Sequence, residues 1–260
     1  MDELYKKIIE QIVSSGKRIR EKSGKIQDIG VTKKNLTEED IKIERELKQI
    51  IKEFNPKHEF YAEEESENFL DVEDVWVIDP ISGTHVFING LPHYGIVAAH
   101  VHNHEVQFAA VYDPSMDDLY TAYRNKGAYL NGQKISVKDT VSEPPKIIFT
   151  LSLGWKDIAS ARKIFYELSN LELYRVPGSS AVNDSLVACG KYNGVVCFAK
   201  DSFPSFASSL MIKEAGGIFT NINGEENIQP SDRVFIGGDK ETYQKLKLVV
   251  EKVLKEMNNR

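Results

Sequence analysis

The chain has 260 residues and a mass of 29.4 kDa, enough for one large domain or two modest ones that fold without a metal or disulfide staple. Its 41% hydrophobic and 28% charged residues exclude wholesale disorder, and its formal charge of −6 gives no support to a nucleic-acid-binding surface. With only two cysteines and no apolar run near the roughly 18 residues of a membrane span, we expect a soluble, cytoplasmic protein that binds neither nucleic acid nor membrane.

The first 54 residues predict two amphipathic helices. The opening sequence MDELYKKIIEQIV is charged from its second residue, so it lacks the basic and apolar regions of a signal peptide. Apolar residues recur at helical spacing from Leu4 to Val13, and a break rich in Gly and Lys follows at 23–35. Thr37 is then expected to cap a second helix, which has an acidic first turn and an apolar stripe that runs to Phe54, just before a proline.

The middle of the chain predicts antiparallel strands. The uninterrupted apolar run at 75–78 is typical of a strand that is buried on both faces. Residues 95–101 and 106–112 are expected to form the arms of a β-hairpin, and the same sheet is expected to continue through 119–123 and 127–130.

The second half of the chain alternates between the two patterns. Strands are expected at 147–151, 194–198, 218–221 and 234–237, and helices at 156–168, 179–189, 205–214 and 241–257. Helices, then antiparallel strands, then βα alternation indicate a layered α+β or α/β architecture. We therefore predict one unit over 1–260, with a helical and antiparallel N-terminal half to about residue 145 and an α/β C-terminal half from about residue 146.

Two stretches contain residues suited to chemistry. One is the acidic run Glu63-Glu64-Glu65, and the other is ISGT, which follows Asp79 and Pro80 at the end of the apolar strand. An aspartate at the end of a buried strand is costly unless it is paired or metal-bound, and carboxylate and carbonyl oxygens are the ligands of Mg²⁺. The alternatives are a solvated acidic loop and a simple turn, and local spacing alone does not bring the two stretches together.

The histidines and cysteines allow two interpretations each. His100, His102 and His104 alternate along one hairpin arm, so they can share a face that binds a transition metal or one that is merely solvated. His85 lies beside the second stretch, and the sequence gives it no role. Cys197 is either a nucleophile or a small strand residue.

The chain resembles the inositol monophosphatase family of Mg²⁺-dependent phosphomonoesterases from about Leu36 to the final helix. The densest match is WVIDPISGTHVFINGLPHYGIVAAHV, and VPGSSAVNDSLVACGKYNGVV and IKEAGGIFTNINGE match two further family blocks. The resemblance implies the αβαβα sandwich of inositol monophosphatase and fructose-1,6-bisphosphatase-like proteins, usually as a homodimer. It also implies hydrolysis of a small phosphorylated metabolite, a phosphate monoester of inositol, a sugar or a nucleotide.

By the same resemblance, several positions take family roles. Glu63, Asp79 and the Ile81 carbonyl match the first metal site, and Thr84 matches the residue that holds the attacking water with Glu63. The positions that match phosphate- and substrate-binding residues are Ser82, Gly83, Thr84, Gly178, Ser179, Ser180 and Cys197.

The chain departs from the family at the second metal site. The family motif DPxDGT reads DPISGT here, so Ser82 replaces an aspartate, and Pro204 stands at the last metal-binding aspartate. Cys197 falls where many relatives have a glutamate that binds a substrate hydroxyl. Asp201 is either a substitute ligand or an exposed residue that helps to start the next helix. We therefore predict one strongly bound Mg²⁺ and weakened catalysis, or a catalytically inactive protein that binds a phosphorylated ligand or a protein partner.

Overall fold

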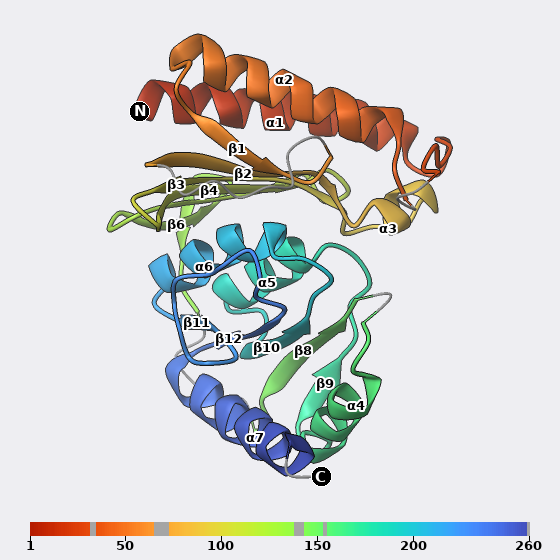
Figure 1. The fold of residues 1–260 in the computed structure, drawn as a ribbon, viewed down its shortest axis with the longest axis vertical. Coiled ribbons are helices and arrows are strands. Elements are labelled where there is room, and N and C mark those ends of the chain that lie inside the picture. Colours follow the sequence, from red (N-terminus) through yellow and green to blue (C-terminus); the bar gives the residue numbers. More distant parts are fainter. Residues whose placement is uncertain (32–34, 65–72, 138–142, 153–154, 259–260) are drawn as a thin grey trace.

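A computed structural model describes residues 1–31, 35–64, 73–137, 143–152 and 155–258. Five layers are stacked along the long axis of the molecule: a helix pair, a seven-stranded sheet, a second helix pair, a five-stranded sheet and a third helix pair (Figure 1). The predicted αβαβα sandwich is confirmed. Residues 32–34 of the expected break, and Glu65, lie outside the described part of the chain. Within that part, no helix has the length and apolar character needed to cross a membrane.

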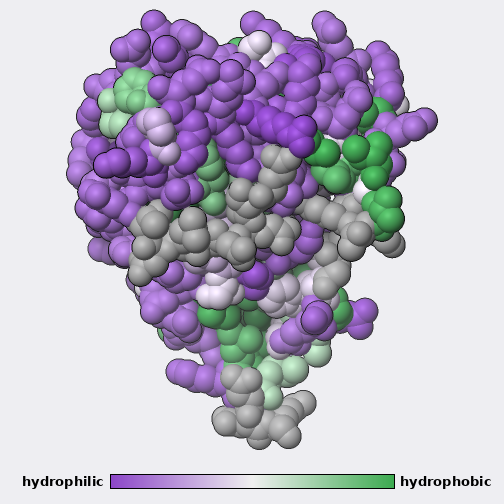
Figure 2. Space-filling model, turned by 45° about the horizontal axis from the view of Figure 1, so that its top comes forward, coloured by the Kyte–Doolittle hydropathy of each residue, from purple (hydrophilic) through white to green (hydrophobic). Residues whose placement is uncertain are grey.

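Both predicted N-terminal helices form, as α1 (Asp2–Lys22) and α2 (Glu38–Phe54). Thr37 caps α2 reciprocally with Asp40, because the Thr37 N–H donates to the Asp40 carboxylate at 2.8 Å while the Thr37 hydroxyl receives backbone N–H groups of the first turn. The helices cover one face of the first sheet with the apolar residues Leu4, Ile8, Ile12, Ile43, Leu47 and Ile51. Each buried side chain of this kind contributes about 1.5–3 kcal/mol. The outer surface in Figure 2 is mostly hydrophilic because the charged faces point outward.

The first sheet has the strand order β1-β2-β3-β4-β5-β6-β7. Its strands are β1 (Glu59–Ala62), β2 (Asp74–Ser82), β3 (Gly95–His102), β4 (Glu105–Asp113), β5 (Asp118–Tyr123), β6 (Gly127–Leu130) and β7 (Gln133–Ile135). β1 and β2 are parallel and the other pairs are antiparallel. The predicted hairpin is β3–β4, and its two-residue turn has φ of 49° at Asn103 and 62° at His104, as a type I′ turn requires.

The second sheet has the order β11-β12-β10-β8-β9. Its strands are β8 (Lys146–Leu151), β9 (Glu172–Tyr174), β10 (Gly194–Phe198), β11 (Ile218–Asn221) and β12 (Val234–Gly238). The helices of this half are α4 (Ile158–Glu167), α5 (Ser180–Ala188), α6 (Phe203–Glu214) and α7 (Lys240–Asn258). In Figure 1, α5 and α6 lie between the two sheets, while α4 and α7 cover the outer face of the second sheet.

Four short elements are absent from the sequence prediction: β1, β7, β9 and the helix α3 (Thr84–Ile88). They have three to five residues each, too few for a hydrophobic period to be seen. α6 begins at Phe203, two residues before its predicted start, because Pro204 in a first turn needs no N–H partner. All of Phe203–Ile212 is buried, so this helix has no solvent-exposed face before Lys213.

Candidate active site

The parallel pairing of β1 with β2 brings the two acidic stretches together. Ala62 is in register with Ile78, and the N–H of Glu63 donates to the Ile78 carbonyl at 3.2 Å. Glu63 therefore lies beside Asp79, a contact that no local spacing could reveal. A register shift in the β2–β3 pairing between Asp79 and Ser82 then leads the chain out of the strand.

Asp79 is buried among other carboxylates. It is 4% exposed, and its Oδ1 has no hydrogen-bond partner among the residues that the structure describes. Burial, then the Glu63 carboxylate and then Asp201 raise the pKa of Asp79 well above its usual value, against a hydrogen bond with Ser82. A buried carboxyl oxygen with no donor, in a group whose pKa two other carboxylates raise, is one that a bound cation would stabilise. These oxygen donors fit Mg²⁺.

Two glycines, Gly83 and Gly178, allow the end of β2, the start of α5 and the segment around His93 to pack closely against one another. Gly83 has φ of +81°, and a Cβ there would lie 2.9 Å from the Ser179 nitrogen. Gly178 has φ of +127°, and its Cβ would lie only 2.1 Å from the His93 carbonyl oxygen. The Ser179 N–H donates to that same carbonyl at 2.7 Å, and the Ser179 hydroxyl donates to the Ser82 hydroxyl at 2.8 Å. The start of α5 is thereby fixed against the end of β2.

Thr84 contacts a residue that the sequence analysis did not select. Its Oγ1 donates to the Ile81 carbonyl at 2.7 Å and lies 3.3 Å from Oδ1 of Asp40, in the first turn of α2. Burial first, and then the neighbouring Glu64 and Glu63, raise the pKa of Asp40 to about 8, although hydrogen bonds from its cap residue oppose the shift. In sequence, the Thr37-x-x-Asp40 spacing indicates only a helix start, which hides the second contact of this carboxyl group.

The altered position Pro204 lies at the start of α6. Pro204 lies in the first turn, and the ring of Phe203 stacks on Tyr61 with centroids 4.2 Å apart. The N-cap of α6 is Ser202, so the interpretation of Asp201 as an exposed helix-starting residue is wrong. Asp201 is instead half-buried, and its charge contributes to the raised pKa of Asp79.

A further buried acid, Asp184, lies close enough to Cys197 for its charge to affect the thiol. Asp184 on α5 is 1% exposed, and its Oδ1 has no hydrogen-bond partner within the described residues. Burial raises the pKa of Asp184 to about 7, although a hydrogen bond with Ser208 opposes the shift. Burial, then Asp184 and then Asp201 raise the pKa of the Cys197 thiol well above its usual value. Cys197 therefore stays a thiol, which argues against the nucleophile interpretation.

The comparisons with known proteins agree with one another. The model of the inositol monophosphatase family matches residues 1–256. The chain is 30% identical over 252 residues to a fructose-1,6-bisphosphatase/inositol-1-monophosphatase of Aquifex aeolicus, covering 93% of both chains. It is 30% identical over 223 residues to inositol monophosphatase 1 of Bos taurus, covering 81% of this chain and 79% of the relative. Among solved structures, the IMPase of Thermotoga maritima superposes with a TM-score of 0.84 at 26% identity, over 98% of this chain and 99% of that one.

Proposed function

The chain belongs to the inositol monophosphatase family of phosphomonoesterases, and we propose that it hydrolyses a phosphate monoester more slowly than relatives with a complete acidic site. Substrates of this class are phosphates of inositol, a sugar or a nucleotide. The observation that carries the proposal is the buried Asp79, which has an unbonded Oδ1 and lies beside two other carboxylates.

The residues of the first metal position are all present. Glu63, Asp79 and the Ile81 carbonyl would hold one Mg²⁺, the ion that this family uses. Bound there, Mg²⁺ would lower the pKa of a water and neutralise charge on the phosphate. The single strongly bound ion is the cofactor state that we propose.

The second position retains one of its three carboxylates, Asp79. Ser82 offers a neutral oxygen that already receives the Ser179 hydroxyl, and Pro204 offers no ligand. Asp201 is the residue that would complete this position if its loop moved toward Asp79. Because each ion of a two-metal site supplies several kcal/mol, the loss is expected to lower the rate by about 10³-fold or more.

The pair formed by Thr84 and Asp40 is suited to orienting the attacking water. Asp40 is protonated at neutral pH in the free protein, since its pKa is about 8. Positive charge beside Glu63 would favour the ionised form of Asp40, which accepts a hydrogen bond from the Thr84 hydroxyl. The Thr84 oxygen would then be free to accept a hydrogen bond from a water held by Glu63.

The phosphate and the rest of the substrate would lie between the two turns that the glycines hold together. The N–H groups of Gly83 and Thr84 begin α3 and that of Ser180 begins α5, where first-turn amides lack acceptors within their own helix. The Ser179 N–H already donates to the His93 carbonyl, so Ser179 would line the pocket with its side chain. Gly178 and Cys197 would line the same pocket. We also propose that the protein forms a homodimer, as the family resemblance implies.

A phosphatase panel with the purified protein tests this function. Inositol monophosphate, sugar phosphates and nucleotides are assayed with Mg²⁺ and Mn²⁺, and calorimetry counts the bound ions. We expect one strong Mg²⁺ site, and hydrolysis of inositol monophosphate at least ~10³-fold slower than by a relative with a complete site. Two strong sites would instead favour Asp201 as a replacement ligand.

The alternative is a catalytically inactive protein that binds a phosphorylated ligand or a protein partner. The packing of Phe203 on Tyr61, and the hydroxyl pair Ser82–Ser179, favour it because they replace charged ligands with neutral contacts. Mg²⁺-dependent phosphate binding without turnover of any ester on the panel would support this function over hydrolysis.

A further inference from the structure

Two of the three histidines near the β3–β4 turn, His100 and His102, contact Asp74, the first residue of β2. Asp74 is in register with His102 of β3, and His100 lies on the same face of that strand. The Nε2 of His100 and the Nδ1 of His102 each lie 2.9 Å from the same oxygen, Oδ1 of Asp74. His104 lies in the turn, with φ of +62°. The alternation therefore brings two of the three histidines to one carboxylate.

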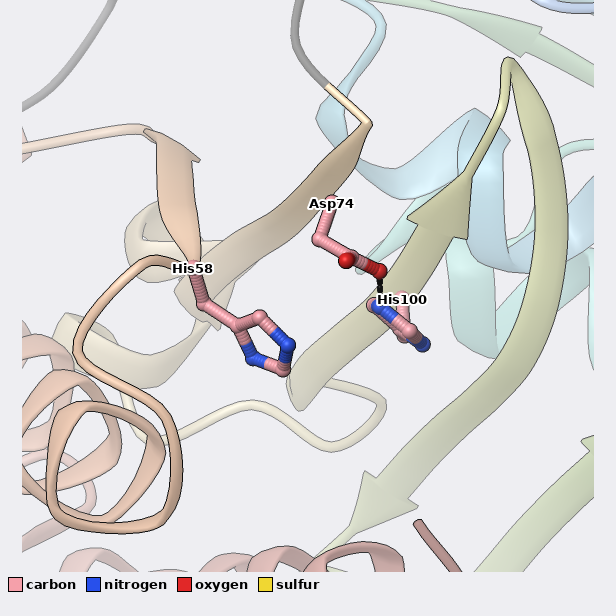
Figure 3. Close-up of side chains that lie close together, drawn as sticks. All are labelled: His58, Asp74 and His100. Atoms are coloured by element: carbon pink, nitrogen blue, oxygen red, sulfur yellow. Dashed lines mark hydrogen bonds and ion pairs between the residues drawn. The ribbon is translucent and has the colours of Figure 1, made fainter.

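A third imidazole approaches the same carboxylate from the segment before β1. Figure 3 shows the edge of the His58 ring turned toward the pair formed by Asp74 and His100. One candidate ligand atom from each of these three residues lies within 4.8 Å of the others. His58 is therefore one candidate for the third ligand beside Asp74 and His100, and His102, whose Nδ1 lies 2.9 Å from Asp74, is the other.

The position of one proton argues against His58. The indole N–H of Trp76 donates to Nδ1 of His58 at 3.0 Å, and an indole nitrogen can only donate. A neutral imidazole that accepts at Nδ1 carries its proton on Nε2, so that nitrogen has no lone pair for a metal. His58 could ligate through Nε2 only by losing the bond to Trp76.

The other two imidazoles are less restricted. The Nδ1 of His100 lies 2.8 Å from the hydroxyl of Tyr5, which can donate or accept. The Nε2 of His102 lies 3.1 Å from the amide nitrogen of Asn103, which can only donate, but Asn103 is exposed and can turn away, and a Glu73 carboxylate oxygen 3.8 Å from Nε2 can accept the proton instead. Each ring can therefore move its proton to the outer nitrogen and turn a lone pair toward Asp74. Partners of this kind orient metal-bound histidines.

From this juxtaposition, we propose that Asp74, His100 and His102 bind a divalent transition-metal ion of the Zn²⁺ type, at the opposite end of β2 from Asp79. Two imidazoles and one carboxylate suit Zn²⁺, Co²⁺ or Ni²⁺, whereas Mg²⁺ prefers oxygen ligands. The His102 side chain is 39% exposed and that of Asp74 is 26% exposed, which gives the ion a route from solvent. The rings of His100 and His102 have centroids 6.5 Å apart, so the exposed His102 ring turns inward on binding.

Cobalt binding by the full-length protein tests the proposal. Co²⁺ is titrated with Mg²⁺ in large excess, so that the oxygen ligands around Asp79 are already saturated, and the visible absorption of four-coordinate Co²⁺ is recorded. We expect about one Co²⁺ per chain with this absorption. Because Trp76 stacks on His100 with centroids 5.0 Å apart, we also expect the ion to quench the fluorescence of Trp76. A Trp155→Phe background isolates that signal, since the chain has two tryptophans.

The variants decide which histidines are ligands. His102→Gln and Asp74→Asn should each weaken Co²⁺ binding at least tenfold. His104→Gln, on the same hairpin, and His58→Gln should retain it. Each variant is checked by circular dichroism, and His102 is exposed enough that its replacement should not unfold the protein. Wild-type affinity in His102→Gln, or no absorbing Co²⁺ in the parent protein, would overturn the proposal. Loss of binding in His58→Gln and Asp74→Asn, with binding retained in His102→Gln, would assign the other triad and overturn this one.

Discussion

Strand β2 carries an aspartate near each end, and the two have opposite electrostatic surroundings. At Asp74, hydrogen bonds from His102 and His100 outweigh the effect of burial and lower the pKa of the carboxyl group. At Asp79, burial acts together with Glu63 and Asp201, and the pKa rises well above its usual value. The neighbours supplied by other segments therefore decide what each carboxylate can do.

The two ends should accordingly prefer different cations. The Asp79 end presents carboxylate, carbonyl and hydroxyl oxygens, which suit Mg²⁺. The Asp74 end presents imidazole nitrogens around a single carboxylate, which suits a borderline transition metal.

The largest effect is expected from Asp79→Asn. The asparagine keeps the shape but removes the charge and one strong ligand, so we expect loss of Mg²⁺ binding in calorimetry. We also expect at least ~10³-fold lower phosphatase activity, because the ion supplies several kcal/mol. Asp118→Asn is the matched control, since Asp118 on β5 accepts a hydrogen bond from Asn131 at 3.2 Å that an asparagine oxygen can also accept. Equal activity of Asp79→Asn and the parent would contradict the proposed site.

The second prediction restores the missing ligands. Ser82→Asp returns a carboxylate that the Ser179 hydroxyl can still reach, and Pro204→Asp places one in the first turn of α6, where negative charge is favoured. Each single change should alter the rate less than about tenfold, whereas the double variant should gain up to ~10³-fold, because ligands of one ion act as a unit.

Calorimetry of the double variant shows whether a second Mg²⁺ binds. A folded double variant that binds phosphate but gains neither an ion nor activity would show that the loop before α6 has been rebuilt. The inactive binding function would then be favoured.

The sequence predicted most of the architecture because the large elements carry strong patterns. The apolar stripes of α1 and α2, the continuous apolar run of β2 and the hairpin β3–β4 were all identified from periodicity and turn residues. The strands β7 and β9 have three residues each, so neither shows a hydrophobic period, and their place follows from pairing with neighbouring strands.

The candidate site was predicted as separate segments rather than as an arrangement. Motif resemblance selected Glu63 and Asp79, but their contact depends on the parallel register of β1 and β2, which is a tertiary feature. The contact of Asp40 with Thr84 was missed because a place in the first turn of α2 was already a sufficient explanation for an acidic residue there. Asp184 was missed because nothing in the pattern of α5 distinguishes a buried aspartate from an exposed one.

The third prediction concerns Asp184, the buried acid behind Cys197. Its pKa rises from 3.8 to about 7 on folding, so above pH 4 the unfolded chain ionises while the folded protein stays protonated. The fold therefore loses stability as the pH rises from 4 to about 7 and loses no more beyond that. An asparagine side chain does not titrate, so the stability of Asp184→Asn relative to the parent should increase by about 4 kcal/mol between pH 4 and pH 8.

Urea unfolding of both proteins at pH 4, 6 and 8 measures this difference. The absolute offset depends on how well the new amide hydrogen-bonds with Ser208, but the pH dependence of the difference does not. Asp157→Asn, at the exposed N-cap of α4, serves as the control, because asparagine is an equally good cap there. A difference between Asp184→Asn and its parent that stays constant with pH would mean that Asp184 is ionised in the folded protein.

The smallest effect is expected at the histidine end, from Tyr5→Phe. The Tyr5 hydroxyl hydrogen-bonds with Nδ1 of the buried His100 at 2.8 Å, and its ring stacks on Phe108 with centroids 4.2 Å apart and planes 8° apart. Phenylalanine keeps the stack and removes only the hydroxyl, so unfolding in urea should become easier by about 1–2 kcal/mol, the cost of an unpaired buried nitrogen. Tyr5→Leu also removes the stack and should cost at least ~1 kcal/mol more. If Tyr5→Phe is as stable as the parent and only Tyr5→Leu is destabilised, the ring and not the hydrogen bond holds α1 to the sheet, and the hydrogen bond to His100 is dispensable for folding. If the two variants are equally destabilised, the hydrogen bond to His100 is the contact that ties the first helix to the start of β2.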